Sequence, residues 1–439
     1  MSASVNTREI ILETLLLITR DGEYSHIAQK SVLDKYQYLE KKERAFITRV
    51  VEGTLERMIE IDYIINQFSK VKVNKMKPVI RTILRSAVYQ MKYMDSVPDS
   101  AVCNESVKLA VKKGFTNLKG FVNGVLRNIS RNLNEIEYPS REDECSYLSV
   151  RYSLPQWLVS QWLKEYDADT VEKMGEAFLK EKPTCIRCNL SKIQTKKLKA
   201  LLETEGVSVI EDPCIPYALY IASYDYLTKL DSFQKGYFYV QDISSMQVAE
   251  WADPKPGQLV IDVCAAPGGK AIHLAEKLEG TGKVIARDLT ESKVGLMQEN
   301  ITRSTLTNIE AEQWDACVCD EKMKEKADIV IADLPCSGLG VLGKKRDLKY
   351  NMTPQMQEDL VKLQRQILSV VQTYVKPGGK LLYSTCTVHK KENEDNARWF
   401  MSRHPEFELI REQQMIPGVH SGDGFYIAMF KKRGDGENG

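Results

Sequence analysis

The chain has 439 residues, of which 43% are hydrophobic and 28% are charged, and it contains ten cysteines. This length exceeds what a single ordinary core requires, so two or three domains are expected. The sequence has no run of about 18 uncharged apolar residues, which argues against a membrane span. Its first apolar stretch carries acids and lacks a small-residue cleavage site, so no signal peptide is expected. The cysteines form no disulfide framework, which favours a reducing cytoplasm.

The net charge of +1 hides an uneven distribution along the chain. Residues 1–135 hold 22 Lys and Arg against 15 Asp and Glu, a net charge of +7, and the remainder carries −6. The densest basic cluster comprises Lys70, Lys72, Lys75, Lys77, Arg81 and Arg85. A solvated helical face explains such a cluster as well as a phosphate-binding surface does.

The chain divides into three consecutive stretches with different residue patterns. Residues 1–138 repeat apolar side chains at three- and four-residue spacing, which predicts an all-helical domain. One of its helices is expected to start at Asp99 and to end near Gly114. Residues 139–235 mix short strand and helix patterns, which predicts a small α/β middle domain.

The third stretch, residues 236–433, alternates strands with helices and predicts a doubly wound, mostly parallel sheet. Its expected strands are 259–263, 283–287, 309–313, 328–332 and 380–385, with 424–432 as a closing edge strand.

The strongest local signal is DVCAAPGGKA, residues 262–271, which leads from an apolar strand through a small-residue turn into a helix. Gly268 and Gly269 let a ligand approach the backbone, and Asp288 ends the next strand, where an acid can bind the hydroxyls of a ribose. The turn lacks the spacing for a pyrophosphate and the ending of a P-loop. A cofactor with adenosine but no phosphates therefore fits best.

Two cysteines end neighbouring strands of the predicted sheet. Cys336 lies in ADLPCSGLG and Cys386 in YSTCTV, so both are expected at the ligand edge. A thiolate that adds to carbon 6 of cytosine makes carbon 5 nucleophilic, after which a base must remove the carbon-5 proton. Asp333 lies three residues before Cys336, where it can face the ring's N3 and amino edge. The residues alone do not decide which thiol is the nucleophile.

The other candidates have plain structural explanations. Asp315 follows the third strand and could bind an adenine amino group, but a surface turn explains it equally well. Cys185 and Cys188 form a CxxC without a second pair, so we expect a structural role and no metal site. Five further cysteines are expected to be inert core residues, namely Cys103, Cys145, Cys214, Cys317 and Cys319.

These motifs resemble those of the RsmB/NOP family of RNA cytosine-5 methyltransferases. DVCAAPGGKA, ADLPCSGLGV and LLYSTCTVHKKENE look like that family's cofactor turn, Pro-Cys motif and Thr-Cys motif. Residues 97–129 are similar to the NusB antitermination factor domain. The resemblance covers nearly the whole chain. It departs from the family pattern at Thr387, at Leu334 and in KKRDLKY (344–350), which lacks a common proline in an RNA-facing loop.

The resemblance implies an all-α NusB-like RNA-binding domain, a small middle domain and a Rossmann-like class I methyltransferase domain. It implies methylation by S-adenosylmethionine of carbon 5 of cytosine 967 in 16S ribosomal RNA, either naked or in an early assembly particle. It further implies that Cys386 is the nucleophile, that Cys336 removes the proton or assists product release, and that Asp333 faces the cytosine. The implied cofactor site is lined by Cys264, Ala265, Ala266, Pro267, Gly268, Gly269, Lys270, Asp288, Asp315 and Asp333.

Two alternatives stay open at this level. One is an RNA-binding ribosome-assembly factor without activity, against which the intact cofactor turn and both thiols argue. The other is a methyltransferase that acts on transfer RNA or DNA. We expect a monomer, because no segment has the pattern of a coiled coil or a repeated interface helix.

Overall fold

The computed structural model describes residues 6–434, which form two compact units. The helical unit contains the residues up to 180 together with 342–351, and the sheet unit contains 181–341 and the residues from 352 onward. Among residues 6–434, no helix is long and apolar enough to cross a membrane. The division into three domains at residues 138 and 235 stays a prediction.

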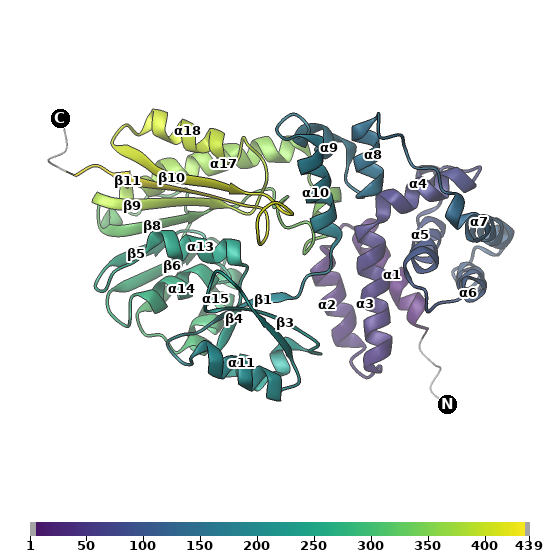
Figure 1. The fold of residues 1–439 in the computed structure, drawn as a ribbon, viewed down its shortest axis with the longest axis horizontal. Coiled ribbons are helices and arrows are strands. Elements are labelled where there is room, and N and C mark those ends of the chain that lie inside the picture. The colour runs from purple at the N-terminus through teal and green to yellow at the C-terminus, as the bar shows by residue number, and fades with distance from the viewer. Residues whose placement is uncertain (1–5, 435–439) are drawn as a thin grey trace. The chain divides into compact units, whose positions relative to one another are not determined.

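The front of the chain is helical, as its apolar spacing predicted (Figure 1). Helix α6 starts at Asp99, and Gly114 takes a positive φ of 86° two residues after the helix ends at Lys112. The first seven helices share one apolar core. The α-helices of the unit are α1 (Thr7–Thr19), α2 (Ser25–Lys35), α3 (Lys41–Glu56), α4 (Met58–Phe68), α5 (Pro78–Tyr93), α6 (Asp99–Lys112), α7 (Lys119–Arg131), α8 (Glu144–Arg151), α9 (Gln156–Trp162), α10 (Ala168–Leu179) and α16 (Leu348–Asn351).

Segment 342–351 folds with the helical unit although it lies between two strands of the sheet unit in sequence. Asp347 accepts hydrogen bonds from the backbone N–H (2.9 Å) and the hydroxyl (2.6 Å) of Ser25. Lys349 is 4% exposed and donates to the carbonyl of Glu56 at 2.7 Å, while Arg346 pairs with the Glu56 carboxylate at 3.1 Å. Buried polar contacts therefore hold the segment in place, and KKRDLKY is not a freely exposed loop.

The sheet unit begins with a four-stranded antiparallel sheet in the order β2-β3-β1-β4. Strands β1 (Thr184–Cys188), β2 (Ser208–Glu211) and β3 (Ala218–Ala222) and helix α11 (Thr195–Thr204) lie within residues 139–235, where short strands and helices were predicted. Strand β4 (Phe238–Val240) lies just after that stretch. The fully buried Arg187 of β1 donates to Gln241 at 2.7 Å and pairs with Glu276. This buried pair fixes the small sheet to the helix that carries Glu276.

The larger sheet has seven strands in the order β10-β11-β9-β8-β5-β6-β7. Five predicted strands are confirmed as β5 (Leu259–Asp262), β6 (Lys283–Asp288), β7 (Ile309–Gln313), β8 (Ala327–Asp333) and β9 (Val375–Thr385), all parallel to their neighbours within this set. The predicted edge position of β11 (Phe425–Lys432) is wrong. It lies between β9 and β10 (Phe407–Met415). The central residues of β10 are exposed to solvent, so this strand lacks the apolar alternation that would have marked it in the sequence.

Helices cover both faces of this sheet (Figure 1). Alternate strand residues point to opposite faces, so Val260 joins the core beneath one helical layer and Ile261 joins the core beneath the other. The first layer contains α13 (Ile243–Ala252), α14 (Gly269–Lys277) and α15 (Glu291–Ser304), and the second contains α17 (Pro354–Val371) and α18 (Glu394–Arg403). A parallel sheet covered on both faces exposes the carboxyl ends of its strands as the place for a ligand.

Replacing Asp347 with alanine should loosen segment 342–351 without unfolding the helices. The change leaves the two buried donors of Ser25 unpaired, at a cost of about 1–3 kcal/mol. Trypsin should then cleave after Lys345 or Arg346 at least tenfold faster, as followed by mass spectrometry. Asp169→Ala removes an exposed pair with Lys173 and should leave the rate unchanged. Equal cleavage in wild type and Asp347→Ala would contradict the assigned role of the Ser25 contacts.

Candidate active site

The parallel pairing of β8 with β9 brings the two predicted thiols together. Asp333 is the register partner of Ser384, whose hydroxyl donates to the Asp333 carboxylate at 2.7 Å. The segments that follow β8 and β9 leave the sheet side by side at this point. Cys336 and Cys386 follow within three residues, and their sulfur atoms lie 3.3 Å apart. The sequence prediction that both cysteines share the ligand edge agrees with this geometry.

Neither Cys336 nor Cys386 is in a disulfide, and both are partly buried. The pKa of Cys336 is raised well above its ordinary value by its hydrogen bond with Cys386, by burial and by the nearby Glu392. Two sulfur atoms this close cannot both carry a charge at low cost. Cys336 therefore keeps its proton in the resting site.

The glycine turn has the backbone form that a close ligand requires. Gly268 has a φ of +102°, which a residue with a Cβ adopts only under strain, and α14 starts at Gly269. A Cβ at Gly269 would meet no atom within 4 Å, so the turn faces open space there. Asp288 is 4% exposed and accepts the backbone N–H of Ala266 at 3.1 Å. The acid predicted to bind a ribose thus lies directly against the turn.

Acidic groups surround the turn. Asp262 is fully buried, and neither of its carboxylate oxygens has a hydrogen-bond partner among the described residues. Burial and the neighbouring Asp333 raise its pKa to about 7. Burial, Asp262, Asp288 and Asp333 likewise raise the pKa of Cys264. Orphaned carboxylate oxygens beside an open turn fit a ligand that carries positive charge.

Lys270 connects the turn with the two-thiol edge. Its ammonium lies 2.8 Å from Asp333 and over the ring of Phe425, 5.4 Å from the ring centre. Burial lowers the pKa of Lys270, but Asp333, Asp262 and Cys386 outweigh it, so the pKa is raised and the lysine stays charged. A fixed positive charge that interacts with Cys386 favours the thiolate form of that sulfur.

The remaining residues singled out in the sequence lie in local structural positions. Asp315 is exposed and accepts the backbone N–H of Cys317 at 2.9 Å, which is the geometry of a local turn. Cys185 and Cys188 are buried on β1, and no cluster of three potential metal ligands occurs within residues 6–434. The expectation that Cys214 is a core residue is wrong, because it is exposed.

Sequence reasoning missed three side chains of this site. Lys293 pairs with Asp288 at 3.0 Å, Ser384 binds Asp333, and the buried Asp262 lies beneath the turn. Of the three, only Asp262 could have been identified from the sequence, because it ends an apolar strand. The lysine and the serine carry no comparable signal.

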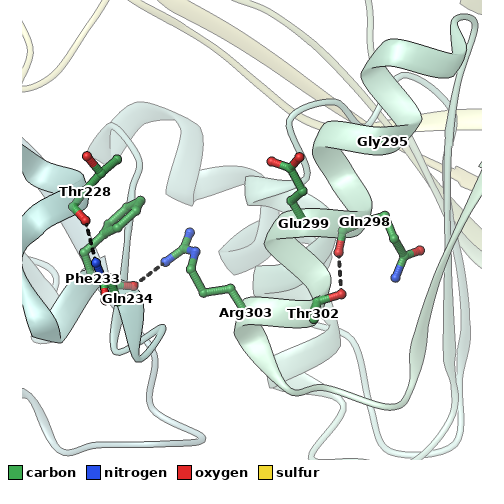
Figure 2. A pocket seen from close by; sticks show the side chains of 8 residues that line it. All are labelled: Thr228, Phe233, Gln234, Gly295, Gln298, Glu299, Thr302 and Arg303. Atoms are coloured by element: carbon green, nitrogen blue, oxygen red, sulfur yellow. Dashed lines mark hydrogen bonds between the residues drawn. The ribbon is translucent and has the colours of Figure 1, made fainter. Parts of the chain in front are cut away.

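A surface hollow of about 660 Å³ lies elsewhere in the sheet unit, between α15 and the segment 228–234 (Figure 2). Two of its polar side chains form local hydrogen bonds. Arg303 donates to the carbonyl of Phe233 at 3.0 Å, and Thr302 donates to the carbonyl of Gln298 at 2.8 Å. None of the predicted site residues lines it. The chemistry is therefore assigned to the carboxyl edge of the sheet.

Comparison with known proteins points to one family. Family models match three parts of the chain, described as the NusB family (5–131), a RsmF/B-like ferredoxin-like domain (154–225) and 16S rRNA methyltransferase RsmB/F (249–431). The chain is 35% identical to a probable ribosomal RNA small subunit methyltransferase B of Bacillus subtilis, over 98% of this chain and 99% of that one. It is 28% identical to ribosomal RNA small subunit methyltransferase B of Proteus mirabilis, over 99% and 100% of the two chains.

Two solved structures share the fold of this chain. The crystal structure of PH0851 covers 98% of this chain and 100% of its own, with a TM-score of 0.82 and 27% identity. NSun6 from Pyrococcus horikoshii, solved with the S-adenosylmethionine analogue SFG, covers 64% of this chain and 99% of its own, with a TM-score of 0.58 and 25% identity.

The fold and the site define a methyltransferase that uses S-adenosylmethionine, whose sulfonium and ammonium groups suit the acidic turn. The chain belongs to the RsmB/F family of 16S rRNA methyltransferases.

Asp262→Asn should change how stability depends on pH. The folded pKa of Asp262, about 7, exceeds the ordinary value of 3.8, so its carboxyl group stabilises the fold at low pH and loses that contribution as the pH rises through 7. Relative to Asp262→Asn, the wild type should lose roughly 2 kcal/mol between pH 5.5 and pH 8 in urea unfolding without cofactor. Asp359→Asn, at an exposed site, should follow the wild type. A constant difference between wild type and Asp262→Asn would exclude this titration.

Proposed function

We propose that the protein methylates carbon 5 of a cytosine in small-subunit ribosomal RNA, at the position implied by the family, cytosine 967 of 16S RNA. The observation that carries the proposal is the pair of thiols 3.3 Å apart beside an acidic cofactor turn. One thiol suffices for a nucleophile, and a second in contact with it supplies the acid–base group that this chemistry needs. The names of the relatives support ribosomal RNA as the substrate.

Cys386 is the nucleophile in this proposal. Cys336 keeps its proton and donates its hydrogen bond, and Lys270 stabilises negative charge on Cys386. The Cys386 thiolate adds to carbon 6 of the ring, so a carbon–sulfur bond forms and the electron pair moves toward carbon 5. Asp333 faces the N3 and amino edge, where it holds the base in place.

The cofactor supplies a methyl group bonded to a positively charged sulfur. We assign its site to the segment Cys264–Lys270 with Asp288, Asp315 and Asp333, and Asp288 would accept hydrogen bonds from the ribose. The electron-rich carbon 5 would take the methyl group as the bond between that group and the cofactor sulfur breaks, which leaves that sulfur as a neutral thioether. The ring would then carry both the methyl group and the former carbon-5 proton.

Cys336 removes that proton. Once the Cys386 sulfur is bonded to carbon 6, it no longer carries the charge that opposed ionisation of Cys336. Cys336 can then release its own proton to solvent and accept the carbon-5 proton. The ring double bond forms again, and the Cys386 thiolate leaves.

RNA affinity is assigned to the exposed lysines that join α4 to α5. Lys70, Lys72, Lys75 and Lys77 are exposed, and no ion pair of the described residues involves them. The other two members of the predicted basic cluster differ. Arg85 is buried against Asp62 at 2.5 Å, and Arg81 is partly buried. Four lysines without acidic partners suit contacts to phosphates, which carry no sequence information.

Replacement of the thiols should separate their roles. With tritiated S-adenosylmethionine and unmodified small-subunit RNA, Cys386→Ala should lose at least a hundredfold in methyl transfer because no adduct forms. Cys336→Ala should accumulate a protein–RNA adduct on denaturing gels, because the proton is not removed. Cys317→Ala, a partly buried cysteine that follows β7, should remain active.

The other outcomes identify the alternatives. If Cys386→Ala still methylates, Cys336 is the nucleophile. If transfer RNA is labelled and ribosomal RNA is not, the substrate assignment is wrong. If the wild type labels no RNA and binds no cofactor, the protein is an RNA-binding factor.

Substitution of the exposed lysines should weaken RNA binding in a way that depends on salt. Lys72→Gln with Lys75→Gln should reduce the slope of log affinity against log salt by about 1–2, because each contact to a phosphate releases roughly one counterion. Filter binding between 50 and 200 mM salt measures the slope. The matched double variant, Lys322→Gln with Lys326→Gln, changes exposed lysines just before the amino end of β8 and should keep the wild-type slope. Equal slopes for the two variants would place the RNA elsewhere.

A further inference from the structure

We propose that the adjacent residues Glu392 and Asn393 are positioning residues that set the distance between the two thiols. Asn393 binds the side chain of the residue before Cys386 and the backbone of the residue after it, and Glu392 holds the residue that follows Cys336. The inference rests on the proposed function for its catalytic meaning, but the geometry it assigns can be measured without RNA.

Asn393 binds both neighbours of Cys386. Its side-chain oxygen accepts the hydroxyl of Thr385 at 2.5 Å, and its amide nitrogen donates to the carbonyl of Thr387 at 3.0 Å. Asn393 and both threonines are fully buried. An asparagine side chain accepts with one atom and donates with the other, so it can hold a hydroxyl and a carbonyl at once. Cys386 is thereby fixed between two anchored residues.

Glu392 binds the loop of the other thiol. Its carboxylate accepts both the backbone N–H (2.9 Å) and the hydroxyl (2.5 Å) of Ser337, which directly follows Cys336. Gln364 of α17 donates to the same carboxylate at 3.0 Å, and His389 lies 2.9 Å from it. Glu392, Ser337 and Gln364 are fully buried. A buried carboxylate is therefore held by three residues, Ser337, Gln364 and His389, which come from three segments of the chain.

A third contact joins the two loops directly. The hydroxyl oxygens of Ser337 and Thr387 lie 2.7 Å apart. Because the Ser337 hydroxyl gives its proton to Glu392, the hydroxyl of Thr387 must donate to Ser337. The network thus runs without a break from the residue after Cys336 to the residue after Cys386. Glu392 and Asn393 are closed to solvent and fall outside the set of residues assigned to substrate and cofactor.

This arrangement explains how two segments beyond the end of the sheet keep their sulfur atoms in contact. Residues that leave a sheet are held only by what they bind, and a shift of about 1 Å in a reacting group can cost about a hundredfold in rate. Each lost hydrogen bond here would also leave a buried donor or acceptor without a partner. The positions of both thiols therefore depend on the Glu392–Asn393 pair.

The readiness of Cys336 and Cys386 to form a disulfide measures this positioning without RNA. Equilibration of the full protein with oxidised and reduced glutathione converts two thiols and one glutathione disulfide into one protein disulfide and two glutathione thiols. Peptide mapping of the Cys336–Cys386 link gives the equilibrium constant and distinguishes it from links between other cysteines. Asn393→Ala and Glu392→Gln should lower that constant at least tenfold. Asn308→Ala removes a buried asparagine contact to Ala275 and should leave it unchanged.

Enzyme kinetics supply the second readout. Both variants should lose at least tenfold in kcat, while their KM and affinity for S-adenosylmethionine stay at the wild-type value. A general loss of folded protein would also weaken cofactor binding. A lower kcat with unchanged KM and cofactor affinity therefore identifies a positioning role. If both variants form the disulfide within twofold of the wild type, the positioning role is refuted, whatever their activity. If the wild-type protein methylates no RNA, the proposed function fails, and the disulfide result still decides the geometry.

Discussion

The parallel pairing of β8 with β9 is the constraint on which the rest of the site depends. Its register places Asp333 opposite Ser384, so the two chains leave the sheet as neighbours and deliver one cysteine each. Residues 50 positions apart in sequence reach contact distance through main-chain hydrogen bonds. The strand pairing thus brings the two sulfur atoms close together, and the side-chain network beyond the sheet then fixes the distance between them.

The electrostatics of the site follow from the same edge. The parallel strands β5, β6 and β8 each end in an aspartate, and these carboxylates gather around one turn. Their mutual repulsion is offset by Lys270 and Lys293, which bind Asp333 and Asp288. Asp262 forms no ion pair of its own among the described residues, and burial together with the neighbouring Asp333 raises its pKa to about 7. The carboxylates around the turn therefore carry more negative charge than the two lysines neutralise. The methyl donor carries a positive charge that fits such a site, and most other nucleoside cofactors lack one.

Sequence patterns predicted the parts of the structure that short-range rules govern. Apolar runs marked five parallel strands, and glycine with proline marked the turn at 262–271. Strand β10 was not predicted, because its central side chains face solvent and the strand has no apolar alternation. The role of Glu392 and Asn393 was not predicted for another reason. Their role depends on contacts with Ser337 and Thr385 that only the folded chain creates, and a buried carboxylate looks like any surface acid in a sequence.

Segment 342–351 gives the chain an interleaved path, since it leaves the sheet unit after Val341, folds with the helices and returns at Met352. A protein assembled by simple end-to-end fusion would cross between its units once. Here the helical unit is completed by a piece of polypeptide encoded in the middle of the other unit. A fragment that starts at residue 181 would carry Asp347 and Lys349 without the groups that bind them. The two units therefore cannot be separated at a single point of the chain, because the helical unit needs residues that lie within the sequence of the sheet unit.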